Sequence, residues 1–136
     1  MTYVEMTIDS LRHAMYKDRW MILLKEKDGQ RYLPVYVDKA SADTVGKLLR
    51  GESSDQIVDD ETFREMEKVL GMADSASLVI DGFEYGVYHA SFNVDWGGSI
   101  HNVEYPIGNS LILAMKAGIQ IWAKEKLFEV TLSARC

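Results

Sequence analysis

The sequence lacks the features that would place it in a membrane or in an oxidising compartment. Its only cysteine is Cys136, so no disulfide can form within the chain, which is typical of a reducing compartment. The most apolar stretch, Ile107 to Ala123, is interrupted by Asn109 and Lys116 and is too short to span a bilayer. Charged residues break the first twenty positions, which therefore hold no apolar signal core. We expect a cytoplasmic protein without membrane contact.

The sequence also has no excess of positively charged residues. The 136 residues include 15 Lys and Arg against 21 Asp and Glu, a formal net charge of −6. Proteins that grip nucleic acid usually gather Lys and Arg on one face, because phosphate contacts dominate their affinity. Here the basic residues are scattered along the sequence, which favours a solvated surface. Transient contact with a nucleic-acid substrate, particularly with the help of a metal ion, is compatible with this charge.

Length and composition indicate one globular domain over residues 1–136, since 47% of the residues are hydrophobic and 26% are charged. The first part of the chain predicts three strands, over Val4–Ile8, Trp20–Leu24 and Arg31–Val37. Between the last two, Asp28-Gly29 predicts a hairpin, because glycine accepts the positive φ of a tight turn. Pro34 cannot donate a ladder hydrogen bond, which suggests an edge strand or a bulge.

Two helices are predicted next. The first starts at a Ser41 N-cap, carries an apolar stripe and ends at Gly51. The second is capped by Asp59 or Asp60 and closed by Gly71, with apolar residues at helical spacing between them.

The second half of the chain repeats this order. We predict strands over Ser77–Ile80, Tyr85–Val94 and Ile100–Tyr105, with a turn at Trp96–Ser99 between the last two. A helix over Gly108–Ala117 is stopped by Gly118 and is followed by a short strand over Ile119–Trp122. The segment from Ile8 to Leu11 aligns with that from Ile80 to Phe83, which suggests an internal duplication. The predicted fold class is therefore α+β: an antiparallel or mixed sheet with three main helices, built from two three-strand-plus-helix units.

Two segments carry a resemblance to a known family. The hairpin from Leu23 to Val37, LLKEKDGQRYLPVYV, resembles the hairpin of the bifunctional nuclease family, and a helix ending in Leu49-Arg50-Gly51 follows it as in that family. The helix from Ser110 to Gly118, SLILAMKAG, resembles the family's second signature. The resemblance extends from about residue 4 to residue 127. It implies an α+β domain, DNase and RNase activity and a homo-oligomer, of which a dimer is the expected form.

Several polar positions differ from the family's pattern. Ser41 stands where the family has Glu, Gln56 replaces Arg, Asp60 replaces His, and Asn109 replaces Asp. Asp43 keeps an acidic position next to the first of these differences. The positions of the scaffold persist, whereas most of the polar ones change.

Phosphodiester hydrolysis requires a positioned water and often divalent metals held by carboxylates. Asp55, Asp59, Asp60 and Glu61 form the densest acidic cluster of the sequence. This cluster indicates a site for Mg or Mn near a helix start, with Asp59 and Asp60 as ligands, or it simply caps the helix and complements its dipole. Asn109 can orient a ligand but cannot ionise, and its alternative role is that of a helix-start residue.

Histidine and tryptophan residues leave further alternatives open. His89 and His101 could face each other across the second hairpin and bind zinc or exchange protons, although their spacing matches no metal motif and ordinary strand positions explain them. The three tryptophans could stack on bases, or they could fill the core or a subunit interface, which we favour.

Two hypotheses follow from the sequence. The first is a metal-assisted nuclease in which Asp43, Asp60, Glu61 and Asn109 are the catalytic positions to test. The second is a non-catalytic oligomeric module, binding or regulatory, that kept the scaffold. The acidic composition and the altered polar positions favour the second hypothesis, and the length of the resemblance favours the first.

Overall fold

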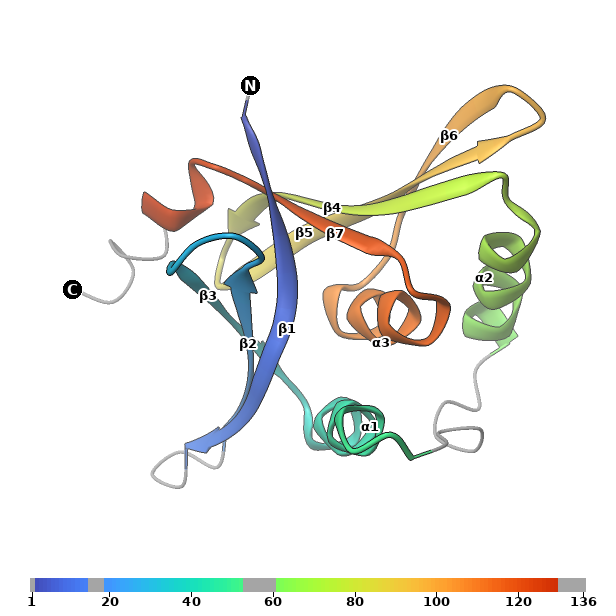
Figure 1. Ribbon diagram of the computed structural model, residues 1–136. Helices are drawn as coiled ribbons and strands as arrows, with labels where there is room; N and C mark the ends of the chain where they lie inside the picture. Colours follow the sequence, from blue (N-terminus) through green and yellow to red (C-terminus); the bar gives the residue numbers. More distant parts are fainter. Residues whose placement is uncertain (1, 15–18, 53–60, 130–136) are drawn as a thin grey trace.

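The computed structural model describes residues 2–14, 19–52 and 61–129, in which seven strands form one sheet and three α-helices pack against it (Figure 1). The strand order across the sheet is β3-β2-β1-β7-β4-β5-β6. One neighbouring pair, β4 and β7, runs parallel, while the other pairs are antiparallel. The prediction of an α+β domain with a mixed sheet and three main helices is therefore confirmed.

The first three strands form an antiparallel meander. They are β1 (Tyr3–Ala14), β2 (Arg19–Glu26) and β3 (Tyr32–Val37), and the helix α1 (Lys39–Leu49) follows directly. β3 lies at the edge of the sheet, as the proline in it suggested. The predicted N-cap of α1 is wrong: Asp38 caps the helix, and its carboxylate accepts a hydrogen bond from the backbone N–H of Ser41. Because β3 already ends at Val37, the helix starts three residues earlier than Ser41 would allow.

The β2–β3 turn needs Gly29 for a reason that differs from the predicted one. Gly29 is not among the glycines with positive φ. A Cβ atom at this position would instead overlap the side chain of Glu26, 2.7 Å from its Cδ and 3.1 Å from its Cβ. Gly29 therefore leaves space for the side chain of Glu26, whose carboxylate lies against the turn.

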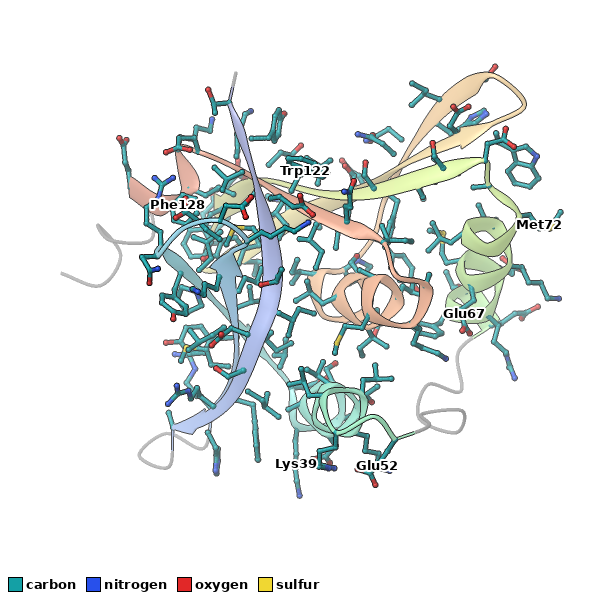
Figure 2. The ribbon with its side chains drawn as sticks, in the orientation of Figure 1. Lys39, Glu52, Glu67, Met72, Trp122 and Phe128 are labelled. Atoms are coloured by element: carbon teal, nitrogen blue, oxygen red, sulfur yellow. The ribbon has the colours of Figure 1, made fainter. Side chains whose placement is uncertain are left out.

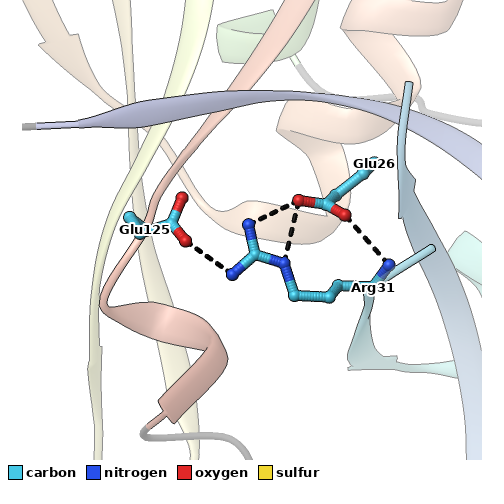
Figure 3. A network of polar contacts seen from close by, with 3 residues as sticks. All are labelled: Glu26, Arg31 and Glu125. Carbon is cyan, nitrogen blue, oxygen red and sulfur yellow. Dashed lines mark hydrogen bonds and ion pairs between the residues drawn. The ribbon is translucent and has the colours of Figure 1, made fainter. Parts of the chain in front are cut away.

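Glu26 belongs to a polar network that links the β2–β3 hairpin to Glu125, the residue directly after β7 (Figure 3). Arg31 donates to Glu26 through Nε at 2.9 Å and through its backbone N–H at 3.0 Å, and to Glu125 at 2.5 Å. The guanidinium also lies 4.2 Å from the ring centroid of Phe128. The hydrogen bonds that Glu26 accepts from Arg31 lower the pKa of Glu26 below its usual 4.5, and the Arg31 side chain makes the largest contribution.

A helix and a second meander follow. They are α2 (Glu61–Met72), β4 (Ser75–Glu84), β5 (Val87–Trp96) and β6 (Ser99–Glu104). The predicted end of α2 at Gly71 is wrong by one residue, since the helix includes Met72, whose side chain points away from the core (Figure 2). The predicted cap, Asp59 or Asp60, lies outside the described residues.

The turns of this meander have glycine where positive φ requires it. Gly97 and Gly98, with φ of 61° and 84°, form the predicted turn between β5 and β6. Tyr85 was predicted to begin a strand, but it forms the β4–β5 turn with Gly86, and both residues have positive φ. Positive φ is uncommon for a tyrosine, so the sequence pattern did not reveal this turn.

The last two elements close the fold. The helix α3 (Ile107–Ala117) ends at Gly118, which adopts the left-handed conformation expected of a C-cap, and β7 (Gln120–Lys124) then inserts between β1 and β4. Each meander is thus followed by a helix, α1 or α3. Each first strand also has a register shift at an aspartate, Asp9 in β1 and Asp81 in β4. The internal duplication itself stays a prediction, with which these shared features agree.

The core lies between the helices and the concave face of the twisted sheet (Figure 1). α1 and α3 lie next to each other against this face, and α2 packs beside α3. Among the described helices none combines the length and the apolarity that a membrane span requires. Most of the largest fully buried side chains come from the two meanders and from α3, and they include Ile22, Leu24, Leu78, Ile80, Phe92, Leu111 and Leu113.

Candidate functional site

Two neighbouring hollows lie on either side of the connection from β6 to α3. The first, which we call the junction pocket, has a volume of about 210 Å³ and lies where the end of β3 meets the starts of α1 and α3. Its lining consists of Tyr36, Val37, Asp38, Ser41, Pro106, Gly108 and Asn109. The second, which we call the edge hollow, has a volume of about 450 Å³ and lies along β5 and the end of β6. Pro106 and Gly108 line both hollows.

Gly108 lets the two helix starts approach each other. A Cβ atom on this residue would lie 3.3 Å from the Ser41 Oγ and 3.7 Å from a methyl carbon of Val37. The first distance is tighter than an ordinary contact, so the absent side chain keeps the first turns of α1 and α3 close. The junction pocket therefore lies between two helix N-termini, a place where backbone N–H groups and helix dipoles favour anions.

Asp38 supplies the carboxylate of the junction pocket. Its Oδ1 accepts a hydrogen bond from the Ser41 N–H at 2.8 Å. This bond, together with one to the Ser41 side chain, lowers the pKa of Asp38 below its usual 3.8. The group is therefore ionised at neutral pH, and a carboxylate of such low basicity is better suited to orient a water or to hold a hard cation than to take up a proton.

The start of α3 carries no comparable cap. Pro106 occupies the N-cap position, and no side chain accepts a hydrogen bond there. The structure places the predicted site residue Asn109 in the first turn of this helix, half-buried and in the lining of the junction pocket. Its amide can accept and donate hydrogen bonds toward a ligand. The same placement also agrees with the alternative role of Asn109 as a helix-start residue.

A cation lies beside the junction pocket. The Arg19 guanidinium carbon is 3.9 Å from the ring centroid of Tyr36, a residue that lines the pocket. Tyr36 is 47% exposed, so the pair lies at the surface. Stacking on an aromatic ring restricts the orientation of a guanidinium and leaves its N–H groups available to an anion such as phosphate.

The charged residues that line the edge hollow are acidic, and a histidine lies beside them. Asp81 at the β4 register shift, Glu104 at the end of β6 and His89 on β5 all line it. No Lys or Arg is among its described lining residues, and the sequence has none between Lys68 and Lys116. His89 Nε2 lies 3.8 Å from Glu84, a carboxylate that could pair with the imidazole when it is protonated.

Amide and hydroxyl groups continue the polar wall of the edge hollow. Asn102 donates hydrogen bonds to Ser91 at 3.0 Å and to Asn93 at 2.8 Å through the same nitrogen. Both donor positions of that amide are therefore used within the sheet. Its oxygen adds an acceptor to the carboxylates, so that acceptors outnumber donors among these groups.

The other predicted site residues that the structure describes, Asp43 and Glu61, lie outside these hollows. Asp43 is exposed on α1 and Glu61 is exposed at the first position of α2, and neither belongs to the lining of the junction pocket or of the edge hollow. Asp59 and Asp60 lie outside the described residues. Within the part of the chain that the structure describes, no three His, Cys, Asp or Glu side chains are grouped as a metal site would require. The catalytic and metal-binding assignments of these residues stay predictions.

The structure excludes the possibility that His89 and His101 face each other. The register of the second meander pairs His89 with Gly82 of β4 and pairs His101 with Val94 of β5. The two imidazoles therefore do not oppose each other across the hairpin. Both residues occupy ordinary strand positions, the interpretation favoured from the sequence.

Sequence reasoning did not select Asp38, Arg19, Tyr36, Asp81 or Glu104. Asp38 had a signal, since it separates a predicted strand from a predicted helix and lies three residues before Ser41. The other four had none, because their proximity depends on strand register and on contacts between distant segments.

A comparison with protein families finds a match for this chain. The model of the bifunctional nuclease domain matches residues 22–134, which is most of the sequence and includes both hollows. Arg19 lies just outside the matched range. No curated protein matches the chain.

Proposed function

The chain belongs to the bifunctional nuclease domain family, and on this premise we propose that it hydrolyses phosphodiester bonds of DNA or RNA at the junction pocket. The observation that carries the proposal is the group of residues at this pocket. A helix start without a side-chain cap, the amide of Asn109 and the carboxylate of Asp38 border one small volume, and the guanidinium of Arg19 stacks on Tyr36, another of its lining residues. Phosphate recognition needs donors and a cation, and water activation needs a carboxylate or a metal.

Each residue has a separate role in this proposal. The first-turn N–H groups of α3 and the Asn109 amide bind the non-bridging phosphate oxygens, and Arg19 neutralises their charge. Tyr36 keeps the guanidinium in place. Asp38 orients the attacking water.

The oxygen groups at the pocket fit a divalent metal of the Mg or Mn type. Asp38, Ser41 and Asn109 supply a carboxylate, a hydroxyl and an amide oxygen, the hard ligands that such ions prefer. Mg²⁺ is commonly held by one or two carboxylates together with substrate phosphates and waters, so a single carboxylate suffices in principle. A bound ion would lower the pKa of its water and stabilise charge on the phosphate.

The test is cleavage of labelled single-stranded DNA, double-stranded DNA and RNA by highly purified protein with Mg²⁺, with Mn²⁺ and with EDTA. Asn109→Ala and Asp38→Ser variants test the junction pocket, and Asp60→Ala with Glu61→Ala tests the acidic cluster predicted from the sequence. We expect metal-dependent cleavage that falls at least tenfold in the first two variants. Loss of activity in the double variant alone would move the site to the start of α2, and Asp43→Asn completes the set.

A second function is favoured by the charge around the edge hollow. Five carboxylates and no Lys or Arg lie between residues 68 and 116, which opposes the approach of a nucleic-acid backbone to this half of the molecule. The alternative is a non-catalytic module, binding or regulatory, on the same scaffold. Absence of cleavage by the wild-type protein in every metal condition would favour this alternative.

We also propose that the protein is a cytoplasmic homodimer. Tyr3, Tyr32 and Tyr36 are exposed large side chains on the β1–β3 half of the sheet, and a subunit interface would cover them. Sedimentation equilibrium tests the dimer: a mass of 15.4 kDa at all concentrations would contradict it.

A further inference from the structure

The edge hollow has no role in the proposed reaction, although it shares Pro106 and Gly108 with the junction pocket. We propose that the edge hollow binds a guanine base, with the carboxylate of Glu104 recognising its Watson–Crick edge. Its place beside a scissile phosphate rests on the proposed function. The binding of the base does not, because it depends on the groups that line the hollow.

The lining excludes a phosphate and favours a hydrogen-bond donor. The side-chain carboxylates of Asp81 and Glu104 have no hydrogen bond or ion pair with another described residue, and no Lys or Arg is among the described lining residues. Two such carboxylates repel an anion. Since the donors of the Asn102 amide are already used within the sheet, a ligand must supply N–H groups to these acceptors.

Guanine supplies these groups in the required arrangement. Its Watson–Crick edge presents two adjacent donors, N1–H and the N2 amino group, which match the two oxygens of one carboxylate. Adenine and cytosine each present one amino donor next to a ring acceptor, and uracil presents one donor between two acceptors. A carboxylate therefore selects guanine, and its bidentate bonds are of the charge-assisted kind.

Glu104 is better placed for this role than Asp81. It pairs with Ser91 at the end of β6, and only Tyr105 separates it from Pro106, which belongs to both hollows. A nucleotide whose phosphate occupies the junction pocket would thus carry its base past Pro106 to Glu104. Asp81 lies on another strand, at the register shift of β4. The volume of about 450 Å³ is within the usual range of small-ligand sites.

The experiment measures the binding of nucleosides without phosphate and without metal, by titration followed by NMR. Guanosine, inosine, adenosine, cytidine and uridine are compared on the wild type, on Glu104→Gln and on Glu65→Gln, an exposed α2 control. We expect guanosine to bind at least tenfold more tightly than the other four. Inosine, which lacks the N2 amino group, separates recognition of that group from general stacking. Glu104→Gln should remove the preference, and Glu65→Gln should keep it.

The outcomes separate this inference from the proposed reaction. A guanosine preference that depends on Glu104 supports the base site even if the protein cleaves no nucleic acid. Equal affinities for all five nucleosides, no binding to a folded wild type, or a preference that Glu104→Gln leaves unchanged would overturn the base site even if cleavage at the junction pocket is established. Unchanged thermal melting of Glu104→Gln shows that the variant is folded.

Discussion

Two substitutions of Asp38, by alanine and by serine, distinguish its role as the N-cap of α1 from its proposed role in the junction pocket. The carboxylate is the N-cap of α1, with its Oδ1 2.8 Å from the Ser41 nitrogen. Loss of an N-cap costs about 1 kcal/mol, so Asp38→Ala should lower the free energy of unfolding by that amount and the Tm by about 4 °C. Serine is as good an N-cap as aspartate, so Asp38→Ser should leave the free energy of unfolding within about 0.5 kcal/mol of wild type.

The effect of Asp38→Ala also depends on pH. Folding lowers the pKa of Asp38 below its usual 3.8, so the ionised carboxylate stabilises the folded state. This contribution is complete above pH 3.8 and is lost as the pH falls through the lower pKa of the folded state. The difference between wild type and Asp38→Ala should therefore be constant near neutral pH and shrink on acidification below 3.8.

Urea unfolding followed by circular dichroism, at pH 7 and at several lower values, measures both effects. The reasoning is refuted if Asp38→Ala is as stable as wild type at pH 7, since the cap would then contribute nothing. It is equally refuted if Asp38→Ser is as unstable as Asp38→Ala, because a capping hydroxyl should replace the carboxylate.

Three further predictions concern the scaffold. Gly29→Ala should destabilise the wild type more than a Glu26→Ala background, because that background removes the Cδ overlap and keeps only the 3.1 Å approach to Cβ. A double-mutant cycle in urea measures the difference, and equal costs in both backgrounds would contradict it. Phe92→Ala should cost about 4 kcal/mol, because the Phe92 side chain on β5 is fully buried in the core; a cost below about 2 kcal/mol would argue against this core. Arg31→Lys removes the guanidinium hydrogen bonds that lower the pKa of Glu26. The variant should therefore lose less stability than the wild type when the pH falls below 4.5. Melting curves that keep the wild-type pH dependence would count against the network.

Local signals predicted the elements of this fold well. The C-cap at Gly118 and the turn at Gly97-Gly98 depend on positive φ. Glycine adopts this conformation readily, so its presence in the sequence predicted both features. Pro34 indicated the edge position of β3 for a similarly local reason, the missing N–H donor. The family match confirms the resemblance that the β2–β3 hairpin and α3 carry.

The errors arose where a distant contact decides between local options. The Asp28-Gly29 pair predicted positive φ, but the glycine is required by the Glu26 side chain, which Arg31 holds under the turn. Asp38 and Ser41 are both good N-caps, and the end of β3 decides between them.

The candidate site was the least predictable feature. Of the candidate site residues that the structure describes, Asp43, Glu61 and Asn109, Asn109 alone lines the junction pocket. The proximity of Asp38 to Asn109 depends on the packing of α1 against α3, which Gly108 permits, and no local pattern encodes that contact.

The most direct test of the central claim is the single-turnover rate of RNA cleavage in Mg²⁺ by wild type and by Asp38→Ser, at equal thermal stability. The proposal predicts cleavage by the wild type that EDTA abolishes, and a rate at least tenfold lower in Asp38→Ser. A wild-type rate in Asp38→Ser would contradict the assignment of the junction pocket. No cleavage by the wild type of RNA or of DNA would contradict the nuclease itself and leave the binding module as the function to pursue.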